Sequence, residues 1–171
     1  GCLGALVITA SHNPYNWLGL KIKSFNGCSV DESFTSEVEK RLMLGNSIEK
    51  IDGVNQLVDI KKFHLDRIKS LFDIDYISKR LKKMKLRIFV DSMHGSAANC
   101  MAEIFASNDL EVISEIRKDA DPFFGGKPPE PLLNYADDLK QILMKNSTNE
   151  VKTLGIIFDG DGDRIAAIDE K

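Results

Sequence analysis

From residue 86 onwards, short β-branched apolar segments alternate with segments whose apolar residues have helical spacing. The sequence predicts strands at 86–90, 110–113, 153–158 and 165–168, and helices at 97–107 and 135–145. Strands that alternate with helices are typical of crossover units, in which neighbouring strands pair in parallel. This part of the chain is therefore predicted to be α/β, an α/β/α sandwich with a mainly parallel mixed sheet.

The earlier part of the chain has a similar but shorter pattern. Strands are predicted at 6–9 and 18–25, and helices at 31–44 and 59–72, where Asp31 can cap the first helix. The pattern weakens after residue 50, and a length of 171 residues suits one large domain or two small ones. We expect a partial domain of the same type over 1–58 and a second domain over 59–171.

Composition excludes several classes of protein. A hydrophobic fraction of 43% is typical of a chain with a core rather than of a disordered one. A net charge of −3 gives no reason to expect nucleic acid as a partner, and the basic run 79–87 is predicted to be a solvated helix end. No apolar run reaches the roughly 20 residues that span a bilayer, so no membrane is expected. Three scattered cysteines do not suggest a disulfide framework, and the cytoplasm is the predicted compartment.

An acidic turn, Asp159-Gly160-Asp161-Gly162-Asp163-Arg164, directly follows a predicted strand. Three carboxylates at alternate positions can converge on one hard cation, and the glycines allow the tight backbone that this requires. Oxygen ligands favour Mg²⁺ or Ca²⁺, so Asp159, Asp161 and Asp163 are the candidate metal ligands. Arg164 beside them suggests a phosphate or carboxylate guest.

A calcium-binding EF-hand is one alternative interpretation of this turn. Asp159, Asp161, Asp163 and Glu170 fall at loop positions 1, 3, 5 and 12. Position 6, which favours glycine, is Arg164, and the predicted flanks are strands instead of helices. A second alternative is a magnesium-dependent phosphatase in which Asp159 is the nucleophile.

A serine turn, Thr9-Ala10-Ser11-His12-Asn13-Pro14, follows the first predicted strand. A hydrolytic Ser-His-Asp triad fits it poorly, because the G-x-S-x-G elbow is missing and His12 adjoins Ser11. A serine that carries a phosphoryl group and faces a divalent cation, an arginine and a lysine is instead a phosphoryl-transfer site. Lys21, on the next predicted strand, is a candidate for proton transfer.

The residues of the two turns together resemble the α-D-phosphohexomutases. The resemblance rests on Thr9–Pro14, on Trp17-Leu18-Gly19-Leu20-Lys21 and on Asp159–Arg164, and it is greatest to phosphoglucomutase and phosphomannomutase. Segments 91–95 and 124–131 also look like second-domain turns of some members. Leu18 departs from the family pattern, which often has Asn before the glycine.

The resemblance implies a role for each residue of the two motifs. Ser11 would be the phosphoserine, and an oxygen of its phosphate would join Asp159, Asp161 and Asp163 around Mg²⁺. Arg164 would contact phosphate, Lys21 would assist proton transfer, and His12 would line the serine loop. The implied reaction interconverts hexose 1-phosphate and hexose 6-phosphate through a hexose 1,6-bisphosphate, with glucose 1,6-bisphosphate or its equivalent as activator. Glucose, mannose and glucosamine phosphates all stay open as substrates.

The resemblance also implies that parts of the enzyme lie outside this chain. The family has four domains, and sugar recognition and a phosphate-binding loop lie on the third and fourth. We therefore expect the sequence to be a fragment of a longer chain, comprising the end of domain 1 and domain 2. We expect it to have negligible mutase activity by itself.

Overall fold

A computed structural model describes residues 2–45, 53–106 and 113–170 of the chain. It divides into two compact units. Unit 1 consists of Gly1–Thr9 and Leu18–Val58, and unit 2 consists of Ala10–Trp17 and Asp59–Lys171. The serine turn thus groups with the unit that holds the acidic turn.

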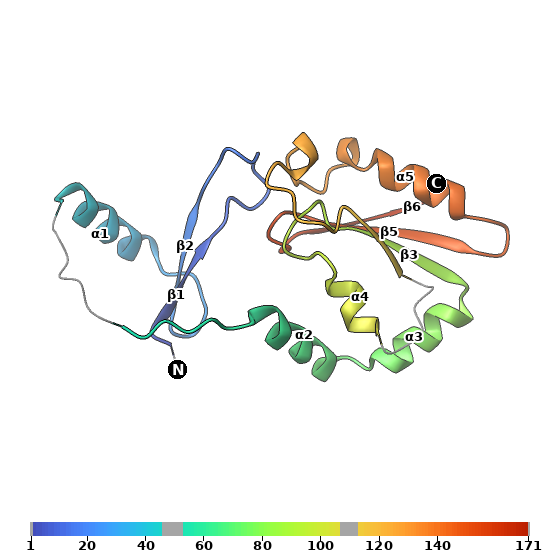
Figure 1. Cartoon of the computed structure of the whole chain (residues 1–171), viewed down its shortest axis with the longest axis horizontal. Helices are drawn as coiled ribbons and strands as arrows, with labels where there is room; N and C mark the ends of the chain where they lie inside the picture. The colour runs from blue at the N-terminus through green and yellow to red at the C-terminus, as the bar shows by residue number, and fades with distance from the viewer. Residues whose placement is uncertain (1, 46–52, 107–112, 171) are drawn as a thin grey trace. The chain divides into compact units, whose positions relative to one another are not determined.

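Unit 1 contains a two-stranded antiparallel ribbon and one helix (Figure 1). Strands β1 (Gly4–Ile8) and β2 (Leu20–Ser24) pair with Leu6 opposite Ile22. Helix α1 (Glu32–Met43) begins where predicted, because the Asp31 carboxylate accepts a hydrogen bond of 2.9 Å from the Phe34 amide.

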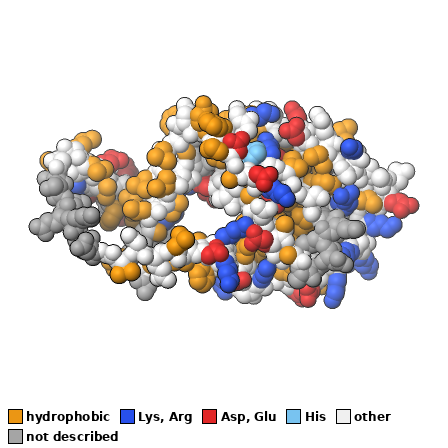
Figure 2. Space-filling view, in the orientation of Figure 1, with side chains coloured by type: hydrophobic (Ala, Val, Ile, Leu, Met, Phe, Trp, Pro, Cys, Tyr) orange, Lys and Arg blue, Asp and Glu red, His pale blue; other side chains and the backbone are white. Residues whose placement is uncertain are grey.

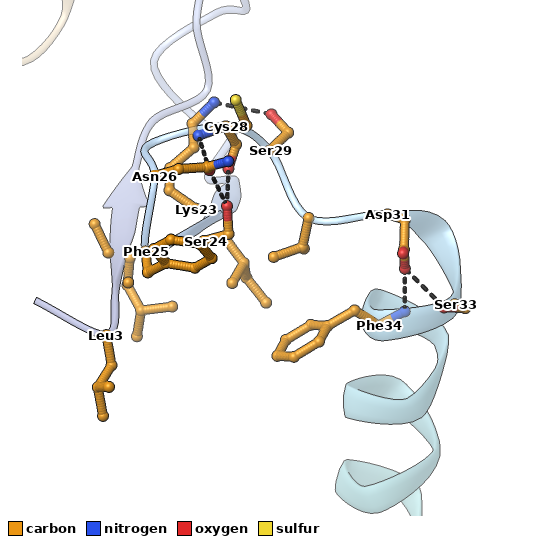
Figure 3. A pocket seen from close by; sticks show the side chains of 15 residues that line it. Leu3, Lys23, Ser24, Phe25, Asn26, Cys28, Ser29, Asp31, Ser33 and Phe34 are labelled. Atoms are coloured by element: carbon orange, nitrogen blue, oxygen red, sulfur yellow. Dashed lines mark hydrogen bonds between the residues drawn. The ribbon is translucent and has the colours of Figure 1, made fainter.

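Hydrophobic side chains are widely exposed on unit 1 (Figure 2). An open groove of about 820 Å³ lies between the ribbon and the start of α1 (Figure 3). Leu3, Phe25 and Phe34 line it, and their exposed fractions are 97%, 81% and 51%. A two-stranded ribbon cannot bury an apolar face by itself, so the described part of this unit has no closed core.

Unit 2 is built on a four-stranded sheet in the order β4-β3-β5-β6. Strand β3 (Leu86–Asp91) pairs in parallel with β4 (Ile113–Ile116) and with β5 (Lys152–Phe158). Strand β6 (Ile165–Asp169) is antiparallel to β5 and forms one edge. The predicted mixed, mainly parallel sheet is confirmed.

Helices cover both faces of this sheet, as Figure 1 shows. Helix α5 (Asp137–Asn146) packs on one face, while α2 (Ile60–Leu71), α3 (Ile74–Lys83) and α4 (Cys100–Phe105) pack on the other. Each face has its own hydrophobic core. The α5 core contains Phe89, Met93, Ala136, Leu139, Leu143 and Ile157, and the opposite core contains Leu65, Ile104 and Phe105. The result is the predicted α/β/α sandwich.

Several element boundaries differ from the prediction. Helix α4 begins at Cys100 instead of residue 97, because Asn99 has a left-handed backbone with φ of 64°. Helix α5 begins at Asp137 after a short 3-10 turn, Leu133–Tyr135. A second 3-10 turn, Phe124–Gly126, lies inside the predicted loop. The predicted strand 110–113 falls mostly outside the described residues, and β4 is described from Ile113.

The EF-hand alternative is wrong, because strands β5 and β6 flank the acidic turn where an EF-hand has helices. Among the described residues, no helix has the length and apolar character needed to cross a membrane.

Candidate metal and phosphoryl-transfer site

The acidic turn joins the antiparallel strands β5 and β6 at the carboxyl end of β5. The Asp159 amide donates to the Arg164 carbonyl at 3.3 Å, and the Gly162 amide donates to the Asp159 carbonyl at 3.2 Å. Gly162 has φ of 76°, a left-handed conformation that favours glycine. These bonds curl the turn so that its three aspartates face a common point.

Asp159, Asp161 and Asp163 each offer a carboxylate oxygen, and the three oxygens lie within 4.8 Å of one another. Asp159 is fully buried, Asp161 is half-buried and Asp163 is exposed. Burial raises the pKa of Asp159 above its ordinary value, and the charges of Asp161 and Asp163 raise it further. Three close carboxylate oxygens suit a hard cation such as Mg²⁺, whose charge would offset this repulsion, so the residues fit that ion.

The serine turn lies against the acidic turn within unit 2. Ser11 Oγ lies 3.4 Å from Oδ2 of Asp159 and 3.3 Å from Oδ1 of Asp161, at hydrogen-bonding distance. Ser11 itself has φ of 55°, and the Asn13 amide closes the turn by donating to the Ala10 carbonyl at 3.0 Å. The hydroxyl oxygen is therefore placed at the entrance to the carboxylate cluster.

Gly160 makes this close approach possible. A Cβ atom on Gly160 would stand 2.5 Å from the Ser11 carbonyl oxygen and 2.9 Å from Cγ of Pro129. On the other side of the acidic turn, the Ser96 amide donates to the Gly160 carbonyl at 2.9 Å. A Cβ on Gly95 would lie 2.6 Å from that same carbonyl oxygen. Two glycines without side chains thus let three loops stack in direct backbone contact.

The remaining predicted residues of unit 2 surround the same cluster. Nε of Arg164 lies 3.9 Å from Oδ2 of Asp159, and its backbone amide donates to Oδ1 at 3.1 Å. The Arg164 side chain is about half exposed, so its guanidinium can still meet an anion from solvent. Nδ1 of His12 lies 3.4 Å from Ser11 Oγ.

Lys21 belongs to unit 1, where it lies on β2 opposite Val7. The structure thus brings together Ser11, His12, Asp159, Asp161, Asp163 and Arg164 in one unit, and it describes Lys21 in the other. The role of Lys21 stays a prediction.

Sequence reasoning assigned no role to Glu130, although this residue lies within a segment that resembled a second-domain turn. Its Oε1 lies 3.9 Å from Nε2 of His12. The neighbouring Pro129 carbonyl accepts a hydrogen bond of 3.1 Å from the Gly160 amide, which holds this loop beside the acidic turn. In the sequence, Glu130 is marked only as a carboxylate among prolines, and this pattern does not indicate which residue it contacts.

Two protein-family models together match most of the chain. The family model for phosphoglucomutase/phosphomannomutase alpha/beta/alpha domain II matches residues 62–171, and the model for domain I matches residues 1–47. The chain belongs to the phosphoglucomutase/phosphomannomutase family.

The relatives of this chain are mutases with different names. Phosphoglucomutase 2 of Saccharomyces cerevisiae is 30% identical, and the match covers 95% of this chain and 33% of the yeast protein. Phosphoglucosamine mutase of Methanococcus vannielii is 31% identical, over 96% of this chain and 36% of its own length. The chain thus spans about a third of the length of the curated relatives that it matches.

Solved structures show the same fold. A phosphoglucomutase/phosphomannomutase family protein from Burkholderia thailandensis superposes with a TM-score of 0.75 at 24% identity. The match covers 98% of this chain and 33% of that structure. The α/β/α architecture of unit 2 is therefore the family's domain architecture.

Proposed function

We propose that this chain is part of a phosphohexomutase that interconverts hexose 1-phosphate and hexose 6-phosphate. The observation that carries the proposal is the position of Ser11 Oγ, 3.3 to 3.4 Å from the carboxylates of Asp161 and Asp159. A hydroxyl at the edge of a cation site can accept a phosphoryl group and return it, because a metal and an arginine neutralise the charge of the transferring group. Ser11 is then the residue that carries the phosphate.

Asp159, Asp161 and Asp163 would hold Mg²⁺, which supplies charge neutralisation at the phosphoryl group when it is bound. Arg164 contributes a fixed positive charge for the phosphate of the substrate, and Lys21 exchanges protons with the sugar hydroxyl. The names of the relatives include glucose and glucosamine phosphate mutases, so the hexose itself is not assigned.

A hexose 1,6-bisphosphate intermediate follows from one serine that serves both ends of the sugar. The serine first gives its phosphate to the substrate, and it then takes the other phosphate back. Glucose 1,6-bisphosphate or an equivalent hexose bisphosphate therefore acts as activator, since it can load an unphosphorylated Ser11.

We assign 1–58 to the end of domain 1 and 59–171 to domain 2. The sugar-binding parts would then lie on further domains. The relatives that match are about three times as long as this chain, which supports the need for those domains. The 171-residue chain alone should therefore have negligible turnover of glucose 1-phosphate.

The proposal is tested by locating the phosphate. The full-length protein is incubated with glucose 1,6-bisphosphate and digested, and the phosphopeptides are identified by mass spectrometry. Phosphate on Ser11, absent in Ser11→Ala, is the expected result. Phosphate on Asp159 would favour the phosphatase alternative, and an unmodified Ser11 would refute the mutase mechanism.

A further inference from the structure

A groove of about 560 Å³ opens in unit 2 where α3 ends and β3 begins (Figure 1). It lies at the amino ends of the parallel strands β3 and β5, whereas the acidic turn follows the carboxyl end of β5. The groove is therefore on the opposite edge of the sheet from the candidate metal site.

Three cationic side chains line this groove, those of Lys82, Lys85 and Arg87. They belong to the run 79–87, which contains six lysines and arginines and no aspartate or glutamate, although the net charge of the whole chain is −3. The helix dipole favours cations in the last turn of a helix, which accounts for Lys82. Lys85 and Arg87 lie beyond the end of α3, so the dipole does not account for them.

We propose that this groove binds a nucleoside di- or triphosphate. The phosphate groups of the ligand lie among the three cations, and its base lies against the apolar part of the lining. This binding site is additional to the proposed phosphoryl-transfer site and does not depend on it.

The guanidinium of Arg87 is held in place before any ligand arrives. Its Cζ lies 5.1 Å from the centroid of the Phe89 ring, and Nη1 donates to Oδ1 of Asn146 at 3.1 Å. The Asn146 side chain is itself fixed, because its Nδ2 donates to the Ile142 carbonyl at 2.8 Å. Neither contact neutralises the positive charge, and a guanidinium has five N–H donors, so Arg87 can bind a phosphate through paired hydrogen bonds.

A tight backbone turn positions the two lysines. Lys85 has a left-handed backbone with φ of 50°, and its amide donates to the Lys82 carbonyl at 3.1 Å. The Lys152 amide donates to the Lys85 carbonyl at 3.1 Å, which joins this turn to β5. Lys82 and Lys85 therefore stand at the two ends of one fixed turn.

One carboxylate competes for these cations. Oε2 of Glu150 lies 3.6 Å from Nζ of Lys85, and the two side chains are 81% and 61% exposed. Solvent weakens an ion pair of this kind. A polyphosphate, which carries several negative charges, can therefore replace Glu150 beside Lys85.

The rest of the lining favours one kind of phosphate ligand. Leu81, Leu86 and Val151 contribute apolar side chains, and Ser114 contributes one hydroxyl group. Ligand sites in proteins are mostly apolar with a few polar groups, and they enclose about 300 to 1,000 Å³. A sugar phosphate would place several hydroxyl groups against apolar side chains at a cost in free energy, whereas the base of a nucleotide suits them.

Larger anions fit this groove less well. Proteins that bind single-stranded nucleic acid combine cations with aromatic side chains on which the bases stack. None of the described residues that line this groove is aromatic. An anionic membrane would meet the exposed lysines of the run but would not fill a groove between α3 and the sheet.

The first test is isothermal titration calorimetry of the full-length protein with ATP, at low salt and without Mg²⁺. We expect ATP to bind and glucose 1,6-bisphosphate not to displace it, because the two ligands would occupy opposite edges of the sheet. ATP should bind at least tenfold more tightly than tripolyphosphate, which has the charges but no base. Absence of ATP binding, displacement by the bisphosphate, or equal affinities for ATP and tripolyphosphate would each overturn the proposal.

Variants locate the binding site. Arg87→Gln should weaken ATP binding about tenfold, as expected for the loss of a charge-assisted hydrogen bond. Lys82→Gln combined with Lys85→Gln should have a similar effect, and both lysines are exposed, so the fold should be unchanged. Arg67→Gln is the matched control, since it removes the same charge from the exposed surface of α2 outside the groove.

The remaining outcomes distinguish the nucleotide from other partners. Wild-type affinity for ATP in both groove variants would overturn the proposal. Phosphatidylserine vesicles and single-stranded RNA are titrated in parallel, and neither should bind more weakly to the groove variants than to Arg67→Gln. If vesicles or RNA lost affinity in the groove variants while ATP did not, the basic run would serve a macromolecule and the proposal would be wrong.

Discussion

The carbonyl oxygen of Ser11 lies so close to Gly160 that a Cβ atom on this glycine would stand 2.5 Å from it. This contact joins the serine turn to the acidic turn through their backbones, and the Ser11 side chain then meets Asp159 and Asp161. The spacing of the two turns depends on the absence of a single methyl group.

Gly160→Ala should therefore push the serine turn away from the acidic turn. We expect the rate of Ser11 phosphorylation by glucose 1,6-bisphosphate to fall about 100-fold, because a displacement of about 1 Å at a reacting group has that effect. Circular dichroism should show an intact fold. Gly53→Ala is the matched control, since among the described residues, its chain neighbours aside, no atom lies within 4 Å of its Cβ position. A wild-type phosphorylation rate in Gly160→Ala would contradict the prediction.

Strands β3, β5 and β6 and helices α2, α4 and α5 could be predicted from sequence, because buried strands and amphipathic helices have different apolar periods. Helix α3 (Ile74–Lys83) was not predicted as a separate element, since only a solvated helix end was expected at 79–87. The acidic turn could also be found, since its three ligand candidates lie within five consecutive residues. The first residue of α4 could not be predicted from sequence. A left-handed backbone at Asn99 delays the helix, and nothing in the apolar pattern of that segment records it.

Contacts between distant segments were the harder part of the site. Ser11 and Asp159 are 148 positions apart, and only the chemistry of the two turns and the family resemblance, with no local pattern, predicted that they meet. No local pattern connects Glu130 with His12, because their proximity depends on how Pro129 packs against Gly160. Long-range loop packing of this kind leaves no periodic signal in a sequence.

Removal of one carboxylate should weaken cation binding. In wild type, Mg²⁺ at 100 times its dissociation constant should stabilise the protein by about 2.7 kcal/mol. Asp161→Asn replaces a half-buried ligand candidate with a neutral group, so the increase in Tm on adding Mg²⁺ should largely disappear. Asp66→Asn removes the same charge from the exposed surface of α2 and should keep the wild-type increase. Equal increases in both variants would refute the cation site.

The pKa of Asp159 predicts how stability depends on pH. Burial raises this pKa above its ordinary value of 3.8, so the folded state keeps its proton to higher pH than the unfolded state does. Without Mg²⁺, the contribution of Asp159 to the free energy of unfolding should fall as pH rises from about 3.8 through the raised pKa. The pKa values of Asp31 and Asp121 are lowered instead, so the contributions of these two residues to the free energy of unfolding are lost as pH falls below about 3.8.

Urea unfolding between pH 4 and pH 7 measures this dependence. The fall in stability should be smaller in Asp159→Asn, which has no proton to lose, and smaller in wild type with saturating Mg²⁺, which binds the ionised carboxylate. A wild-type slope that matches Asp159→Asn over this range would show that Asp159 has an ordinary pKa.

A buried ion pair supports the turn that contacts Gly160. Asp91, at the end of β3, is fully buried and accepts from Nε of Arg117 at 2.8 Å and from the Met93 amide at 3.0 Å. Nη2 of Arg117 also donates to the second carboxylate oxygen and to the Tyr135 carbonyl. This network holds β3, β4 and the loop before α5 together beneath the stacked turns.

Asp91→Asn should therefore destabilise the protein by about 3 kcal/mol, because it leaves the largely buried guanidinium of Arg117 without an opposite charge. The matched comparison is Glu103→Gln, which breaks the pair between Lys61 and Glu103 at 2.5 Å. Both partners of that pair are more than a third exposed, so its loss should cost about 1 kcal/mol or less. Free energies of unfolding from urea titration decide the comparison. Equal losses in the two variants would show that the Asp91–Arg117 pair is no more important to the fold than a surface contact.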